Sequence, residues 1–167
     1  MTTNNNIDIS KYTAGSNTCD LKCAYNFDYP ETNLVATNRG IMINCMLDNN
    51  TSTPVVYNQQ KYSVASMMIV SPSIHFFNGN QTNPAGNQTN AEIIISHTPS
   101  VSGNSLAVCI PIIQSNDTND ASNLVTSIIQ SVANSANQQG QQVNINSNIT
   151  LNTIIPKQPF YSYTSTD

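Results

Sequence analysis

Few side chains in this sequence have the chemistry to bind a metal or to move a proton. The only histidines are His75 and His97. A catalytic zinc site needs three protein ligands and one open position for water. A three-histidine site therefore cannot be built from this chain, and we expect neither a cofactor nor enzymatic activity.

The cysteines leave two interpretations open. They lie at positions 19, 23, 45 and 109. Cys19 and Cys23 are close enough in sequence to form a disulfide or to supply half of a metal site. The alternative, which we favour, is that the cysteines stay reduced in an intracellular protein.

Charged residues are scarce, at 8% of the chain, and the formal net charge is −4. Affinity for nucleic acid depends on many contacts between basic side chains and phosphates. The five bases are too few and too scattered to provide them, and they argue equally against sulfated glycans and anionic membranes. We expect any partner to be held by shape and hydrogen bonds rather than by charge. The bases are Lys11, Lys22, Arg39, Lys61 and Lys157.

No secretory signal is predicted, because residues 1–6 lack both a basic and an apolar region. The longest apolar run, 106–113, contains Pro111 and is far shorter than the roughly 20 residues that span a bilayer.

The spacing of apolar residues predicts a mostly β, antiparallel-rich α+β fold with one main helix. We expect an extended arm over 1–20 and a single domain over 21–167. The helix is expected from Ala121 to Asn137, with Asp120 as its N-cap and Gly140 as its C-terminal stop. Strands are predicted at 41–47, 62–70, 73–77, 91–97, 106–110 and 143–151, with turns or loops at 49–54, 78–90 and 99–104.

Several segments, in the same order along the chain, resemble the α-carbonic anhydrase family. Residues 6–9 (NIDI) resemble its Pro-Ile-Asp-Ile signature, and 38–40 resemble its Asn-x-Gly before a strand. Residues 73–79 (SIHFFNG) resemble Phe-His-Phe-His-Trp-Gly, and 91–97 (AEIIISH) resemble Ala-Glu-Leu-His-Leu-Val-His. Residues 106–108, the helix, 154–156 and 161–163 resemble the next strand, the helix, Leu-Leu-Pro and Tyr-x-Tyr. The resemblance implies the family's fold.

The family's zinc ligands do not carry over. The resemblance places the first ligand on His75, the second on Phe77 and the third on Ile94. His97 matches another histidine of the family and faces away from Ile94. Glu92 matches the glutamate that orients the third ligand, so here it needs a new hydrogen-bond partner. We expect a filled apolar cleft with His75 hydrogen-bonded at its edge; a non-standard metal site using His75, Glu92 or the cysteines is the alternative.

The chain also stops before the family's Ser-Leu-Thr-Thr-Pro-Pro segment and the strands that follow it. The resemblance thus implies a partial fold with an open sheet edge, which invites pairing. We expect either that the polypeptide continues past Asp167, where a membrane anchor could lie, or that a partner covers the edge.

The segments 20–27 and 71–75 look most like carbonic anhydrase-like proteins of large DNA viruses. That resemblance implies a non-catalytic virion component, a minor capsid or virion membrane-associated protein that contacts the major capsid protein or other capsid proteins. The alternatives are a glycan-binding host-attachment module on the virion surface and, less favoured, a residual carbonic anhydrase.

Overall fold

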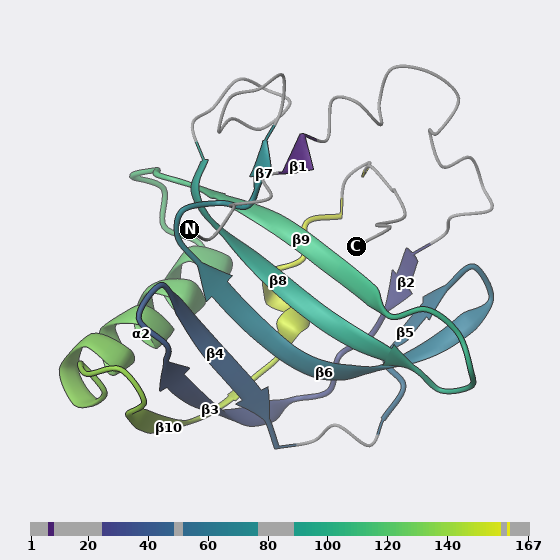
Figure 1. Cartoon of the computed structure of the whole chain (residues 1–167), viewed down its shortest axis with the longest axis horizontal. Helices are drawn as coiled ribbons and strands as arrows, with labels where there is room; N and C mark the ends of the chain where they lie inside the picture. Colours follow the sequence, from purple (N-terminus) through teal and green to yellow (C-terminus); the bar gives the residue numbers. More distant parts are fainter. Residues whose placement is uncertain (1–6, 9–24, 49–51, 77–88, 158–159, 161–167) are drawn as a thin grey trace, which may run out of the picture.

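The computed structural model describes residues 7–8, 25–48, 52–76, 89–157 and 160. Within them the chain forms two sheets, one α-helix and one short 3-10 helix (Figure 1). The α-helix is α2 (Asp120–Ser135) and the 3-10 helix is η2 (Leu151–Thr153). The strands are β1 (Ile7–Asp8), β2 (Tyr25–Phe27), β3 (Thr32–Asn38), β4 (Met42–Leu47), β5 (Val55–Tyr57), β6 (Gln60–Val70), β7 (His75–Phe76), β8 (Thr89–Pro99), β9 (Leu106–Ile113) and β10 (Gln142–Ile149).

The main sheet is antiparallel and is organised around the long strand β6. One edge of β6 pairs with β8, which pairs in turn with β9. Its other edge is shared, with β5 at the start of the strand and β4 at its end. Beyond β4 lie β3 and β10, and beyond β5 lies β2. The strands β1 and β7 form a separate parallel pair.

An irregularity in β6 decides which side chains face the core. The register with β8 shifts between Val64 and Ser66, so Ala65 is an extra residue on β6. Before the shift Tyr62 and Val64 are buried, and after it Met67 and Ile69 are. One inserted residue reverses the alternation of a strand, and it keeps the apolar side chains of both halves on the core side.

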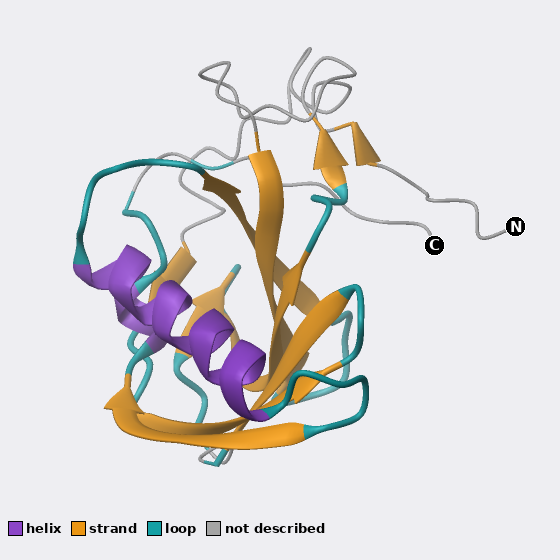
Figure 2. Ribbon diagram, turned by 90° about the vertical axis from the view of Figure 1, so that its left-hand side faces the viewer, coloured by secondary structure: helices purple, strands orange, loops and turns teal. Residues whose placement is uncertain are grey.

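The helix α2 lies against β10 and β3, and Figure 2 shows it running across the sheet. Ile128 and Val132, one turn apart, are buried, and so is Ala136 at the C-cap. The helix begins with a capping box. The Asn119 side chain accepts from the Ser122 backbone N–H at 2.8 Å, and the Ser122 hydroxyl accepts from the Asn119 N–H at 2.9 Å.

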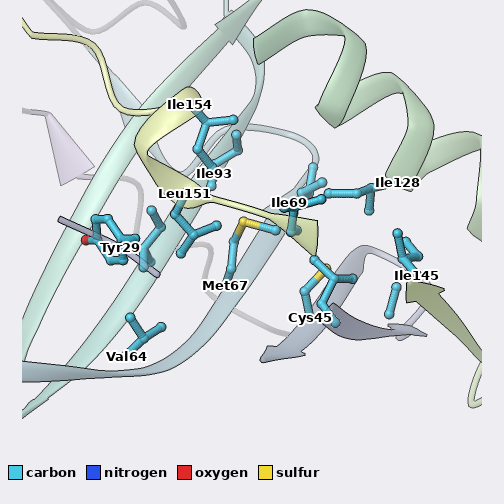
Figure 3. Packing of buried hydrophobic residues seen from close by; sticks show 14 of the residues in the cluster. Tyr29, Cys45, Val64, Met67, Ile69, Ile93, Ile128, Ile145, Leu151 and Ile154 are labelled. Atoms are coloured by element: carbon cyan, nitrogen blue, oxygen red, sulfur yellow. The ribbon is translucent and has the colours of Figure 1, made fainter. Parts of the chain in front are cut away.

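The core lies on one face of the main sheet, where α2, η2 and Tyr29 pack against the strands. Figure 3 shows Met67 surrounded by side chains from β4, β6, β8 and η2. The tightly buried members include Leu34, Cys45, Met67, Ile95, Ile128 and Leu151. Because β8 contributes Ile93 and Ile95 to this face, its alternate residues must lie on the opposite face.

The fold class predicted from sequence is confirmed, as are the helix and most of the strands, within a few residues at their ends. The predicted N-cap is wrong, because Asn119 caps the helix and Asp120 lies in its first turn. The helix ends well before Gly140, whose positive φ of 90° serves the turn into β10. The strands β2, β3 and β5 were not predicted.

The predicted arm over 1–20 lies almost wholly outside the described residues, so that boundary stays a prediction. Among the described residues, no helix is long and apolar enough to cross a bilayer.

Truncating a core methionine should cost far more than truncating a surface one. Met67 is 1% exposed, whereas Met46 on the neighbouring strand is 45% exposed. We expect Met67→Ala to lower the free energy of unfolding by about 2–5 kcal/mol, and Met46→Ala to change it by about 0.5 kcal/mol. Urea unfolding of the two variants measures this, and equal losses would contradict the assignment of faces.

Candidate functional site

The sheet face opposite the core carries Ile94, the residue that the sequence resemblance places at the family's third zinc ligand. Its neighbours in the sheet are Met68 on β6 and Cys109 on β9. All three side chains are partly buried. Ile94 is therefore flanked by the thioether of Met68 and the thiol of Cys109, and none of these three side chains is charged.

The strand beside Ile94 is thus β6, and not the segment 73–77 that the sequence resemblance indicated. The β6 residues that pair opposite Ser96, Ile94 and Glu92 are Ser66, Met68 and Val70. None of these side chains is a customary zinc ligand. His75 lies on β7, which pairs with β1 rather than with β8. Phe77 lies outside the described residues.

His75 nevertheless reaches this face through Glu92. The His75 Nδ1 atom lies 3.1 Å from Glu92 Oε1 and 3.0 Å from Oε2. The His75 backbone N–H donates to Oε2 at 3.2 Å, and the Ser73 hydroxyl donates to the same oxygen at 2.9 Å. Glu92 is 1% exposed. The expected new hydrogen-bond partners of the Glu92 carboxylate are therefore Ser73 and His75, on the segment between β6 and β8.

The balance of effects on Glu92 favours its ionised form. Burial raises the pKa of the carboxyl group, but hydrogen bonding to His75, the charge of His75 and the Ser73 hydroxyl together outweigh it. The net result is a pKa below the usual value. A protonated His75 completes a buried ion pair, with side chains 13% and 1% exposed.

The order in which Ser73, Glu92 and His75 are hydrogen-bonded limits what this cluster can catalyse. A hydrolytic triad needs a hydroxyl hydrogen-bonded to the imidazole, which is oriented in turn by the carboxylate. Here the Ser73 hydroxyl donates to the carboxylate. The arrangement can fix the His75 ring, but it does not make Ser73 a nucleophile.

Metal ligands do not gather at this face within the described part of the chain, where no group of three or more His, Cys, Asp or Glu side chains lies together. Cys45 and Cys109 are free thiols. Burial raises the pKa of Cys45 to about 12, so it stays a thiol at neutral pH, and the thiolate is the form that binds metals. Cys19 and Cys23 lie outside the described residues.

A second polar cluster, which the sequence reasoning missed, surrounds His97. The Tyr29 hydroxyl lies 2.7 Å from His97 Nε2 and 2.7 Å from the Tyr25 hydroxyl. His97 Nδ1 lies 3.2 Å from the Leu106 carbonyl oxygen. A carbonyl only accepts, so Nδ1 carries the proton. The neutral ring then accepts from Tyr29 at Nε2, and Tyr29 accepts from Tyr25.

Burial sets the protonation of this second cluster. It lowers the pKa of His97 to about 4 and raises the pKa of Tyr25 to about 12. It raises the pKa of Tyr29 as well. All three groups are therefore neutral at pH 7, as the direction of their hydrogen bonds requires. Because His97 faces the core side of β8 and Glu92 faces the other side, the two clusters are separate.

Replacing the buried carboxylate should destabilise the fold. In Glu92→Gln the amide NH₂ meets hydrogen-bond donors of Ser73 and His75, so at least one donor is left unsatisfied. We expect a loss of about 1–3 kcal/mol in the free energy of unfolding at pH 7. Glu31→Gln, at an exposed position, is the matched control and should change it little. Equal effects would show that the cluster around Glu92 contributes nothing.

His97 should make the fold sensitive to mild acid. Its pKa is about 4 in the folded chain, against an ordinary value of 6.5. Between these two pH values His97 is protonated in the unfolded chain but not in the folded chain. The free energy of unfolding therefore falls as pH drops from 6.5 towards 4. By pH 5 the loss is about 2 kcal/mol. Urea unfolding at pH 7.5 and 5 measures it.

The control for this measurement is His97→Gln, which cannot titrate. It should be less stable than the parent at pH 7.5, but it should lose correspondingly less stability at pH 5. An identical pH dependence in both proteins would show that another group is responsible.

Comparison by sequence identifies no relative. No protein-family model matches the chain, and no curated protein matches it either.

Comparison of folds does identify similar structures. Carbonic anhydrase Cah3 from Chlamydomonas reinhardtii, in complex with acetazolamide, matches with a TM-score of 0.69 and 14% identity over 91% of this chain and 59% of that one. The α-carbonic anhydrase of Photobacterium profundum matches with 0.65 and 16%, over 92% and 60%. Dioscorin complexed with ascorbate matches with 0.57 and 16%, over 75% and 47%.

The chain spans about three fifths of the length of the carbonic anhydrases it matches. Identities this low show the fold alone. Residues 25–157, as far as they are described, have a carbonic anhydrase-like fold.

Proposed function

We propose that this chain is a non-catalytic, carbonic anhydrase-like structural component of a large DNA virus particle. In this proposal it is a minor capsid or virion membrane-associated protein that acts by contact with capsid proteins. The fold supplies a scaffold, and the former metal position supplies no reactive group.

One observation carries the non-catalytic part of the proposal. The position that corresponds to the third zinc ligand is Ile94, and its cross-strand neighbours are Met68 and Cys109. Catalytic zinc ionises a bound water because imidazole or carboxylate ligands hold the metal and leave one position open. An alkyl side chain, a thioether and one thiol do not provide such a set.

The engagement of His75 also supports this part. Its Nδ1 atom and backbone N–H are both within hydrogen-bond distance of Glu92. The glutamate that orients a metal ligand elsewhere is here occupied by a contact that holds the β7 segment.

The viral part of the proposal rests on the sequence. Residues 20–27 and 71–75 resemble carbonic anhydrase-like proteins of large DNA viruses, and few charged residues are available to attract nucleic acid or sulfated glycan. Uncharged polar surface of this kind suits a contact held by shape and hydrogen bonds.

Metal analysis tests the non-catalytic part. The chain is purified, incubated with zinc and dialysed, and its metal content and CO2-hydration rate are measured beside an active α-carbonic anhydrase. We expect less than one equivalent of retained zinc and a rate equal to the buffer blank. One equivalent of zinc with measurable turnover would overturn the proposal.

Analysis of particles tests the structural part. Purified virions of the encoding virus are treated with an amine- and carboxyl-reactive cross-linker and analysed by mass spectrometry. We expect cross-links between this chain and capsid proteins, for example through Lys61 or Lys157. Absence of the chain from purified particles would refute the virion assignment without affecting the metal result.

A further inference from the structure

A row of hydrogen-bonded rings joins residues 25–29, which we call the covering segment, to the middle of the main sheet. The Tyr25 hydroxyl bonds to the Tyr29 hydroxyl, Tyr29 bonds to His97, and His97 bonds to the Leu106 carbonyl oxygen. Tyr29 is 3% exposed and His97 is 1% exposed. Their ring centroids lie 5.9 Å apart. Tyr29 therefore lies against the His97 ring and helps to exclude water from it.

These hydrogen bonds require the neutral form of His97. The Nε2 atom of the neutral ring accepts from the Tyr29 hydroxyl, whereas an imidazolium ring has two donors and no acceptor. After protonation, Tyr29 would have to accept from Nε2 and donate to Tyr25, and Tyr25 would have to donate elsewhere. Protonation of His97 in the closed fold thus requires every bond of the row beyond the ring to reverse its direction.

Within the described part of the chain, nothing charged compensates a protonated His97. Its pairing partners in the sheet are Val64 on β6 and Leu106 on β9. The titratable groups that face it are the hydroxyls of Tyr25 and Tyr29, and the carboxylate cluster lies on the opposite face of β8. Burial, and not a nearby charge, lowers the pKa of His97. Because a buried charge without a partner is costly, the imidazolium is favoured only where water reaches the ring.

Opening of the covering segment is the easiest way for water to reach the ring. β8 is paired with β6 and with β9 along most of its length, whereas β2 has three residues and, among the described strands, pairs only with β5. The Asp28 N–H also donates to the Pro54 carbonyl, and the Tyr29 N–H donates to Asn152 Oδ1, both at 2.9 Å. The Thr150 hydroxyl donates to the Tyr29 carbonyl at 2.8 Å. Local opening favours units with few such contacts.

We infer that the Tyr25–Tyr29–His97 chain is an acid-sensitive switch, in which protonation of His97 releases residues 25–29 from β8 while the rest of the main sheet stays folded. The inference assigns the acid response to one segment, and it does not rest on the proposed function. In the closed form the rings of Tyr25, Phe27 and Tyr29 pack in a row, with centroids 5.1 and 5.8 Å apart. Acid would therefore make this aromatic surface available for contact.

Proton linkage gives the size of the response. The pKa of His97 is about 4 in the closed form, against an ordinary value of 6.5 that the hydrated ring of the open form should have. Between these two pH values the open form binds a proton that the closed form does not, so a fall in pH favours opening. The equilibrium constant for opening should rise about 30-fold between pH 7.5 and pH 5.

Hydrogen exchange of the full chain at pH 7.5 and pH 5, corrected for the intrinsic pH dependence of exchange, measures this opening. The amides of Asp28 and Tyr29 report on the covering segment, because the bonds described above protect them in the closed form. The amides of Met67 and Ile95, at buried positions of β6 and β8, report on unfolding of the main sheet. We expect the protection of Asp28 and Tyr29 to fall about 30-fold and to depend little on low concentrations of urea. Met67 and Ile95 should remain better protected at both pH values.

Three variants separate the contributions to the switch. His97→Gln cannot titrate and should abolish the fall in protection between pH 7.5 and pH 5. Tyr29→Phe removes the hydroxyl that donates to His97, and it should increase opening at pH 7.5 about fivefold, as expected for the loss of one buried hydrogen bond. Tyr62→Phe is the matched control, because it removes a hydroxyl from another buried tyrosine that bonds to Gln60 instead. It should leave the opening of the covering segment unchanged.

Three results would overturn the inference. The first is that Asp28 and Tyr29 show the same protection and urea dependence as Met67 and Ile95, since the whole sheet would then open together. The second is equal protection of Asp28 and Tyr29 at the two pH values. The third is a full pH-dependent fall in His97→Gln. The first two results need only the parent chain, so they decide the question even where a variant fails to fold. None of the three affects the proposed function, which metal content and virion cross-links test.

Discussion

The register between β6 and β8 determines which side chains of the main sheet face the core and which face the opposite side. One extra residue near Ala65 keeps Tyr62 and Val64 on the core side together with Met67 and Ile69. The same register places Met68 beside Ile94 on the opposite face. The packing of the core and the set of side chains on the opposite face are therefore fixed together. Shifting β6 by one residue would bury Met68 and expose Met67, and the core would lose its central side chain.

Much of this fold could be predicted from sequence, because its elements follow simple periods. β8 has a run of β-branched residues, and α2 has apolar residues at helical spacing, so both were found. β3 was missed because its sequence, Thr-Asn-Leu-Val-Ala-Thr-Asn, has a polar residue at each end; only its pairing with β4 and β10 makes it a strand. Asn119 was missed as the cap because Asp120 is an equally good candidate until the Ser122 bond is seen.

The candidate site was predictable in part. The absence of a three-histidine set follows from counting, and Glu92 was expected to need a new partner. That the partner is His75 depends on how the chain between β6 and β8 folds back, which no local pattern encodes. The placement of Met68 beside Ile94 depends on the register shift, which periodicity alone does not reveal. The Tyr25–Tyr29–His97 chain depends on a contact between residues 68 positions apart.

The two buried polar clusters have different consequences for the sheet. The hydrogen bonds around Glu92 tie the β7 segment to β8 on the face opposite the core, and contacts with Ser73 and His75 occupy the acceptor sites of the glutamate. The chain through Tyr29 and His97 ends at the Leu106 carbonyl, the first residue of β9. It therefore anchors the start of β9 from the core side. Together the two clusters hold β8 from both of its faces, through Glu92 on one and through His97 on the other.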